Sequence, residues 1–427
     1  MAVSAMAGGL APGSDPLSAE LTFWWWGEDE APGLGAWLEG ACEAFEASHE
    51  VRVRLRLLRH DEVLPGFPAA AAAARAPDLH FFWNGIYLVD HVWKGYLAPL
   101  DGLVDEAELE AIGGGPQSRV GGKTYRAAWY VIPVLWVANR AVLARAGVDR
   151  LPATWDELVA ACERVRAAGL SPITAGDGEG DFSVWWLTHF LTQALDDAAD
   201  AARLVLGELD WREPRYAAPW ARLAEARHAG FLDAEALPLT LWQGLERFNE
   251  GESAFTLASG PMFAGCRRAL GEKATVLVAP SAGAGRLAGL PIVDTQGIGV
   301  SASCPRPRLA AAFLRLLHDE ERRRSLWEDV RLFPADRRWP GPGADADPDY
   351  LRMWDWYARG PSAPYVPNLM PLELHYRLAA EIGQAVLAGA LDGREAGAEA
   401  RVRSRAWVEA DAERAEVYRR WILEASA

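Results

Sequence analysis

Residues 121–165 read GGKTYRAAWYVIPVLWVANRAVLARAGVDRLPATWDELVAACERV, and a second structural unit begins within them, after Pro133. The end of this stretch predicts a helix over Thr154–Gly169. Thr154 and Glu157 form a capping box, in which the two residues satisfy backbone N–H groups at the start of a helix. Apolar residues then recur at the spacing of one helix face, at Leu158, Ala161, Cys162 and Val165.

Upstream of this stretch, strands and helices alternate. We expect strands at 21–26, 51–58 and 78–83, with helices at 35–49 and around the alanine run 69–74. This order predicts a parallel sheet with right-handed crossovers, and ligands bind beyond the carboxyl ends of such strands. The residues at those ends are Trp24, Trp25, Trp26, Glu28, Arg59, His60, Asp61, Trp83 and Asn84.

Downstream, the same mixture of elements continues, so the whole chain is predicted to be α/β. Extended segments are expected at 171–175, 252–261, 274–280 and 294–303. Helices are expected after 181, from 262, over 309–317, and along the charged tail 372–427. The glycines at 113–115 and 283–289 flank no phosphate-binding turn.

Composition excludes several classes of protein. A chain of 427 residues is too long for one ordinary core, so two lobes are expected. A net charge of −16 repels nucleic acid and anionic lipid. No apolar run approaches the length that spans a bilayer. We expect the four cysteines to be free and buried, and their spacing matches no zinc motif: Cys42, Cys162, Cys266 and Cys304.

Residues 1–20 lack the basic start and apolar core of a secretory signal, and we expect them to form a disordered lead-in. No early cysteine is available for a lipid anchor. Two explanations stay open: an export signal is missing from this sequence, or the protein stays inside the cell.

Four segments together resemble the sugar-binding family of extracellular solute-binding proteins of ABC importers (family 1, maltose/multiple-sugar-binding-like). HFFWNGIYLVDHVWKGYLAPLD (80–101) resembles a strand and helix ending in "GYLxPLD", and residues 121–165 resemble "DGKxYGxP", "YNKDLFEKAG" and "PPTTWDEL" in turn. Residues 244–263 and 297–328 resemble two later segments, and the order holds over residues 21–423. Trp136 stands where tyrosine is common, and Asn139-Arg140 replaces Asn-Lys.

The resemblance implies a two-lobed, periplasmic-binding-protein-like fold of type II. It places 21–130 plus 294–330 in the first lobe and 131–293 plus 331–427 in the second. Hinge crossings are expected near Tyr130–Pro133, Pro291–Gln296 and Leu332–Pro334. It further implies a monomer outside the cell membrane or in the periplasm, which binds a mono- or short oligosaccharide between the lobes and delivers it to a permease. No catalysis, cofactor, metal or nucleic acid is expected.

Tryptophan is the strongest clue to the site, with 20 residues in the chain. Sugars present apolar C–H faces that stack on flat rings, and hydroxyl groups that need polar partners. Strand alternation makes at least one of Trp24–Trp26 a core residue, and Trp185 and Trp186 point about 100° apart on a helix. The expected ligand-binding residues are Trp26, Glu28, Arg59, His60, Asp61, Trp83, Asn84, Trp129, Asp181, Trp185, Trp186, Ser259, Met262, Gln296, Trp354 and Asn368.

Two other functions remain open at this point. A glycoside hydrolase also uses a tryptophan-lined cleft, with two carboxyl groups about 5–9.5 Å apart; Glu28, Asp61, Asp181 and Asp294 could supply them. A binder of another solute, such as a polyamine or an amino acid, is the third reading, and a polyamine would need several carboxylates converging on the aromatic walls. Motifs of serine hydrolases, zinc proteases and nucleotide-binding proteins are absent from the sequence.

Overall fold

The computed structural model describes residues 19–232 and 237–426. The predicted lead-in therefore lies almost wholly outside the described residues, and Ala19 and Glu20 already belong to the first strand. Within the described part, one sheet of nine strands has the order β2-β1-β3-β11-β7-β9-β8, with β4 on β11 and β10 on β7. The mixed α/β fold confirms the predicted fold class.

The first lobe is built on three parallel strands, as the alternation of elements predicted. β1 pairs with β2 and with β3 in parallel. In β2, Val51 and Val53 are buried while Arg52 and Arg54 are exposed, so one face of this strand covers the core. The elements are β1 (Ala19–Trp25), α1 (Leu34–His49), β2 (Val51–Leu57), α2 (His60–Ala72), β3 (Leu79–Phe82), α3 (Ile86–Trp93), β4 (Leu97–Ala98) and α4 (Glu106–Ile112).

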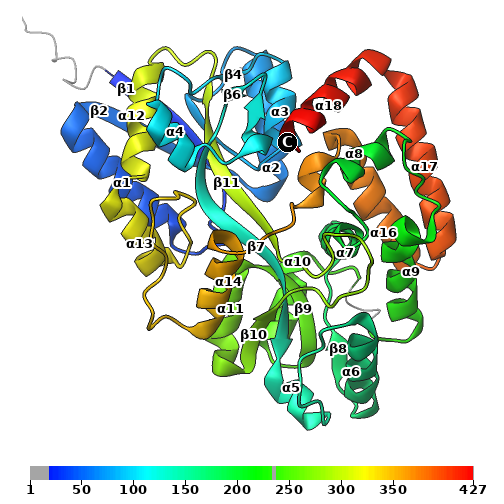
Figure 1. Cartoon of the computed structure of the whole chain (residues 1–427). Helices are drawn as coiled ribbons and strands as arrows, with labels where there is room; N and C mark the ends of the chain where they lie inside the picture. Colours follow the sequence, from blue (N-terminus) through cyan, green and yellow to red (C-terminus); the bar gives the residue numbers. More distant parts are fainter. Residues whose placement is uncertain (1–18, 233–236, 427) are drawn as a thin grey trace, which may run out of the picture.

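Two long strands, β7 (Ala127–Asn139) and β11 (Ile292–Ser301), run through the middle of the molecule (Figure 1). β11 pairs with β3 in the first lobe and with the first half of β7. From Val134 onward, β7 pairs instead with β9 (Ser253–Ser259), and its last residues pair with β10 (Ala274–Leu277). The two strands therefore connect the first-lobe sheet to a second lobe built around β8, β9 and β10.

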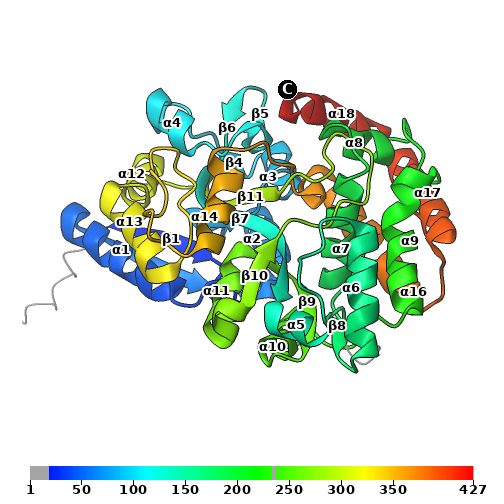
Figure 2. The same ribbon diagram turned by 60° about the horizontal axis from the view of Figure 1, so that its bottom comes forward.

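Helices enclose the second lobe. The predicted helix after Thr154 is α6, and its capping box is present: Glu157 N donates to Thr154 Oγ1 at 3.3 Å. Helix α9 lies beside α17 in both views (Figures 1 and 2). The elements are α5 (Arg140–Arg145), α6 (Trp155–Ala167), β8 (Ser171–Ile173), α7 (Asp181–Thr192), α8 (Ala199–Val205), α9 (Pro214–His228), α10 (Leu241–Asn249) and α11 (Gly260–Leu270).

The C-terminal part returns to both lobes. Helices α12 and α13 pack on α1 of the first lobe, and α14 packs on β7. Helix α18 reaches the first lobe, where Glu424 accepts hydrogen bonds from the backbone N–H groups of Gly121 and Gly122 (Figure 1). The elements are α12 (Pro307–Leu317), α13 (Glu320–Val330), α14 (Pro348–Ala358), α15 (Leu372–Tyr376), α16 (Ile382–Leu387), α17 (Gly393–Ala410) and α18 (Ala412–Ala425).

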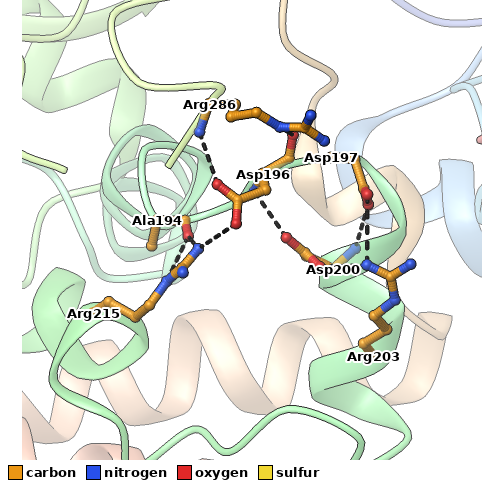
Figure 3. Close-up of polar contacts among 7 residues, drawn as sticks. All are labelled: Ala194, Asp196, Asp197, Asp200, Arg203, Arg215 and Arg286. Carbon is orange, nitrogen blue, oxygen red and sulfur yellow. Dashed lines mark hydrogen bonds and ion pairs between the residues drawn. The ribbon is translucent and has the colours of Figure 1, made fainter. Parts of the chain in front are cut away.

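The glycine-rich loop after β10 is fastened to the end of α7. A Cβ on Gly283 would lie 2.1 Å from the carbonyl oxygen of Gln193, so only glycine allows this close approach. The backbone N–H of Arg286 donates to Asp196, whose other carboxylate oxygen pairs with Arg215 (Figure 3). These contacts lower the pKa of Asp196, with the Arg286 N–H as the largest cause. The loop after β10 therefore holds its place by contacts with the end of α7.

All four cysteines are free and buried, as the sequence predicted. Each lobe has its own apolar core, which accounts for many of the tryptophans. Trp129 belongs to the first-lobe core, while Trp136, Trp186 and Trp220 belong to the second. Within residues 19–232 and 237–426, no helix combines the length and apolar character that a membrane crossing requires.

Candidate functional site

A cavity of about 180 Å³ lies between the lobes, at the place where β7 and β11 pass from one to the other. It receives side chains from the turn after β1, from α2 and α3, from β7 and β11, and from α7, α10, α11 and the segment around α15. The lining residues are Trp26, Glu30, His60, Leu64, Trp83, Tyr87, Ile132, Val134, Asp181, Val184, Trp185, Leu241, Trp242, Ser259, Met262, Asp294, Gln296, Tyr365, His375 and Tyr376.

Of the three consecutive tryptophans, only Trp26 lines this cavity. The guanidinium of Arg56 lies over the Trp24 ring, 4.4 Å from the ring centroid, and Trp25 is buried. β1 ends at Trp25, and Gly27 follows Trp26 with φ 124°, a conformation that L side chains rarely adopt. The chain therefore turns at this point, and the Trp26 ring comes to lie 5.4 Å from the Trp83 ring.

The first turn of α3 adds a polar contact between the lobes. Tyr87 and His375 of α15 are joined by a hydrogen bond of 2.9 Å between the phenol oxygen and Nε2. Burial lowers the pKa of His375 to about 4, so the imidazole is neutral at pH 7. Nδ1 of His375 lies 3.3 Å from the carbonyl oxygen of Leu372, which can only accept, so Nδ1 carries the imidazole hydrogen and Nε2 accepts from the Tyr87 phenol.

Three carboxyl groups line the cavity, and burial raises the pKa of each. The pKa of Glu30 rises to about 7; a hydrogen bond from Ser259 opposes the shift and the charge of Asp294 adds to it. For Asp294, the Arg126 guanidinium opposes the effect of burial. For Asp181, the opposing neighbour is His60, while Glu179 raises the pKa further.

Some polar atoms of the lining have no hydrogen-bond partner within the described part of the chain. They are Trp26 Nε1, Glu30 Oε2 and Gln296 Oε1, and all three residues are at most 6% exposed. Buried polar atoms are nearly always paired in proteins, since an unpaired one costs about 1–3 kcal/mol. Three such atoms bordering one cavity are free to bond with a molecule that enters it.

The structure brings eight of the predicted site residues together around the cavity. Trp185 borders it while its neighbour Trp186 is buried, as the angle between successive helix positions suggested. The eight are Trp26, His60, Trp83, Asp181, Trp185, Ser259, Met262 and Gln296.

Two predicted amides, Asn84 and Asn368, lie outside the lining. Asn84 donates to Asp294 Oδ1 at 3.2 Å, so it positions a lining carboxyl. The backbone oxygen of Asn368 would lie 2.2 Å from a Cβ on Gly85, whereas its side-chain amide has no hydrogen-bond partner in the described chain. Asn84 therefore supports the wall through its side chain, and Asn368 contacts it through its backbone.

The other predicted residues lie elsewhere, each for a local reason. Glu28 accepts hydrogen bonds from Gly33 and Gly35 at the start of α1, at 2.8 and 2.7 Å. Arg59 and Asp61 pair with each other at 2.8 Å, and both side chains are at least 70% exposed.

The remaining three are tryptophans in core positions. Trp129 packs between Phe23 and Trp37, and Trp186 donates from Nε1 to the Pro219 carbonyl at 2.9 Å. Trp354 packs on Trp339, with ring centroids 4.7 Å apart. Helix and strand periodicity alone cannot separate such core rings from cavity rings.

Sequence reasoning missed several lining residues. Glu30 lies two positions after Glu28 in the same turn, and only the turn geometry separates their roles. Asp294 was considered only as a possible hydrolase carboxylate. The aromatic character of the others was the available signal: Tyr87, Trp242, Tyr365, His375 and Tyr376.

Two α/β lobes joined by long shared strands, with an aromatic-lined cavity between them, define the class of two-lobed solute receptors. The family model for "Bacterial extracellular solute-binding protein" matches residues 28–321, and the chain belongs to this family. A comparison with curated protein sequences finds no match.

Solved structures share the fold over most of the chain. A chitin oligosaccharide binding protein is 22% identical with a TM-score of 0.82, over 91% of this chain and 98% of its own. An ABC transporter solute-binding protein from Thermotoga lettingae, bound with α-D-tagatose, is 18% identical with a TM-score of 0.76, over 91% and 99%. The bacterial receptor AcbH, which prefers β-D-galactopyranose, is 14% identical with a TM-score of 0.77, over 92% and 99%.

Proposed function

We propose that this protein binds a mono- or short oligosaccharide in the cavity between its lobes. The observation that carries the proposal is the pairing of flat aromatic walls with unsatisfied polar atoms. Trp26, Trp83 and Trp185 offer faces on which sugar C–H groups stack, and Glu30 and Gln296 offer free acceptors for hydroxyl groups. The sugar ligands of the structurally similar receptors support this choice of solute.

The two-lobed arrangement also supports delivery of the sugar to an ABC transporter permease outside the cytoplasm. Hinge motion between the lobes would signal to the permease that ligand is bound. Three chain segments meet side by side at the crossing: Tyr130 pairs with Gln296, and Val131 N donates to Phe333 O at 2.8 Å. Closure about this crossing would bring the two walls of the cavity onto the ligand. Ligand and permease are then the two partners of a non-catalytic receptor.

Binding without catalysis fits the carboxyl groups better than glycoside hydrolysis does. Asp294 accepts a hydrogen bond from Asn84, and the charge of the buried Arg126 guanidinium also acts on it, so this carboxyl group is not a free acid or base. A hydrolase would need one free acid and one free base flanking the scissile bond. Membership in the solute-binding family also supports binding.

Calorimetric titration with a panel of neutral, acetylated, amino and acidic sugars tests the proposal. We expect at least one sugar to bind the wild type, and Trp83→Ala to weaken it at least tenfold, because a stacking wall is removed. Trp24→Ala is the matched control, since this ring lies under Arg56 and outside the cavity lining. Failure of every sugar to bind, together with hydrolysis of an aryl glycoside, would establish the hydrolase instead.

A further inference from the structure

The cavity lining is rich in carboxyl groups. Glu30, Asp181 and Asp294 all contribute carboxyl groups, whereas none of the described lining residues is lysine or arginine. The nearby Arg126 is fully buried outside the lining, where it donates to Thr295. A ligand therefore meets three carboxyl groups, and the one described lining side chain whose charge opposes them is His60, which acts on Asp181.

The three carboxyl groups differ in how far the protein compensates them. Asp294 has the amide of Asn84 at 3.2 Å and the charge of Arg126, and Asp181 has His60 nearby. For Glu30 the only hydrogen-bond partner in the described chain is Ser259, which donates to Oε1 at 2.6 Å. Glu30 is 6% exposed, and its Oε2 has no partner there. It is the carboxyl group whose charge the protein leaves uncompensated.

Two of the three unpaired atoms are acceptors, so they need hydrogen-bond donors from a ligand. Glu30 Oε2 and Gln296 Oε1 are acceptors, and Trp26 Nε1 is the one donor among the three. A hydroxyl group has one proton to donate, whereas an ammonium has three and carries the charge that a buried carboxylate lacks. Aromatic rings such as Trp26 and Trp83 also attract a cation through their faces.

We propose that the ligand is an amino sugar whose protonated amine pairs with Glu30. This inference rests on the proposed carbohydrate function and narrows it to sugars with a free, unacetylated amine. Sugar acids are disfavoured, because their carboxylate would be repelled by the three lining carboxyl groups. The raised pKa of Glu30, about 7, agrees with a carboxyl group that lacks a cation when the cavity is empty.

Matched sugars test this at pH 7 by calorimetry. D-glucosamine is compared with D-glucose, N-acetylglucosamine and D-glucuronate, and the disaccharide of glucosamine is compared with cellobiose. We expect the amine to bind at least tenfold more tightly than its neutral counterpart. In Glu30→Gln this ratio falls below threefold, and in Glu39→Gln, an exposed carboxyl group on α1, it keeps the wild-type value.

Proton release gives a second readout that a structural role of Glu30 would not produce. With a pKa of about 7, Glu30 is half protonated at pH 7, and pairing with an ammonium lowers that pKa. Titration in buffers of different ionisation enthalpy should show release of about half a proton per amine bound in the wild type. Glu30→Gln should show none.

The possible negative results distinguish a failure of the amino-sugar inference from a failure of the carbohydrate function. Neutral sugars that bind as tightly as the amines overturn the amino-sugar inference and leave the carbohydrate function standing. An amine preference that survives in Glu30→Gln overturns the role of Glu30. If no sugar binds, or if spermidine binds more tightly than every sugar, the carbohydrate function itself is wrong.

Discussion

The hydroxyl of Ser259 donates a hydrogen bond of 2.6 Å to Glu30, across 229 positions of sequence. Glu30 lies in the turn after β1 of the first lobe, and Ser259 ends β9 of the second. The bond therefore joins the lobes at the cavity. It also leaves the second oxygen of the same carboxyl group without a partner in the described chain, so that one side chain contacts the opposite lobe and borders the cavity.

The first prediction concerns pH. Burial and the charge of Asp294 raise the pKa of Glu30 from 4.5 to about 7 in the folded protein, and Ser259 only partly opposes this. The folded state then holds this proton more tightly than the unfolded state does, so stability from Glu30 is present below pH 4.5 and lost as pH rises through 7. Between pH 5 and 8, the wild type should lose about 2–3 kcal/mol of unfolding free energy relative to Glu30→Gln.

Urea unfolding of both ligand-free proteins at the two pH values measures this difference. The charge of Glu30 also acts on Tyr130. The pKa of Tyr130 is raised well above 10, so Tyr130 stays neutral between pH 5 and 8. Glu39→Gln should show no such pH-dependent difference from the wild type, because Glu39 is exposed. A wild-type curve that parallels that of Glu30→Gln would contradict the raised pKa.

The second prediction separates two adjacent tryptophans of α7. Trp185 lines the cavity, whereas Trp186 is 1% exposed and packs in the second-lobe core. Trp186→Ala should cost about 3–5 kcal/mol of unfolding free energy, the usual range for a large ring removed from a core. Trp185→Ala should cost less stability and weaken ligand binding at least tenfold.

Each variant serves as the control for the other, because the two residues share a helix and a side-chain type. Chemical unfolding gives the stability, and calorimetry on the folded protein gives the affinity. Equal losses of affinity in both variants would show that Trp185 acts through the core and not as a wall of the cavity.

The sequence predicted the helices and strands better than it predicted which side chains line the cavity. Capping and periodicity located α6 at Thr154, and strand–helix alternation gave the parallel order of β1, β2 and β3, because both depend on local spacing. Whether a side chain lines the cavity depends on the last few residues of a turn. Trp24 and Trp26 alternate to the same face of an ideal strand, yet β1 ends between them, and only Trp26 reaches the cavity.

Glu28 and Glu30 illustrate the same limit. Both are carboxylates in one turn, and the sequence analysis named only Glu28, among the residues at the carboxyl end of the first strand. The structure uses Glu28 to accept the N–H groups of Gly33 and Gly35, and turns Glu30 toward the cavity. Its partner, Ser259, comes from a strand more than 200 residues away, and no local pattern contains such a pairing.

The third prediction tests the contact of Tyr87 with His375. Tyr87→Phe removes the phenol proton that His375 accepts, and the loss of one such bond is worth about 0.5–1.5 kcal/mol. If this bond stabilises the closed arrangement, ligand affinity should fall about two- to tenfold. Tyr418→Phe is the control, because Tyr418 bonds to Leu369 and neither residue lines the cavity, so this variant should change stability without changing affinity. Unchanged affinity in Tyr87→Phe would remove this bond from the closing mechanism.

The last prediction uses the two glycines that flank α3. Gly85 and Gly95 both have positive φ, 62° and 73°, so alanine is strained at either position. A Cβ on Gly95 would meet nothing within 4 Å, whereas one on Gly85 would lie 2.2 Å from the backbone oxygen of Asn368. Gly95→Ala should therefore cost about 1 kcal/mol, and Gly85→Ala about 3 kcal/mol or more, because a backbone atom cannot rotate away. Since Asn84 precedes Gly85 and holds Asp294, Gly85→Ala should also weaken ligand binding, which Gly95→Ala should preserve. Urea unfolding and calorimetry measure both effects, and similar values for the two variants would show that the contact with Asn368 does not fix this wall.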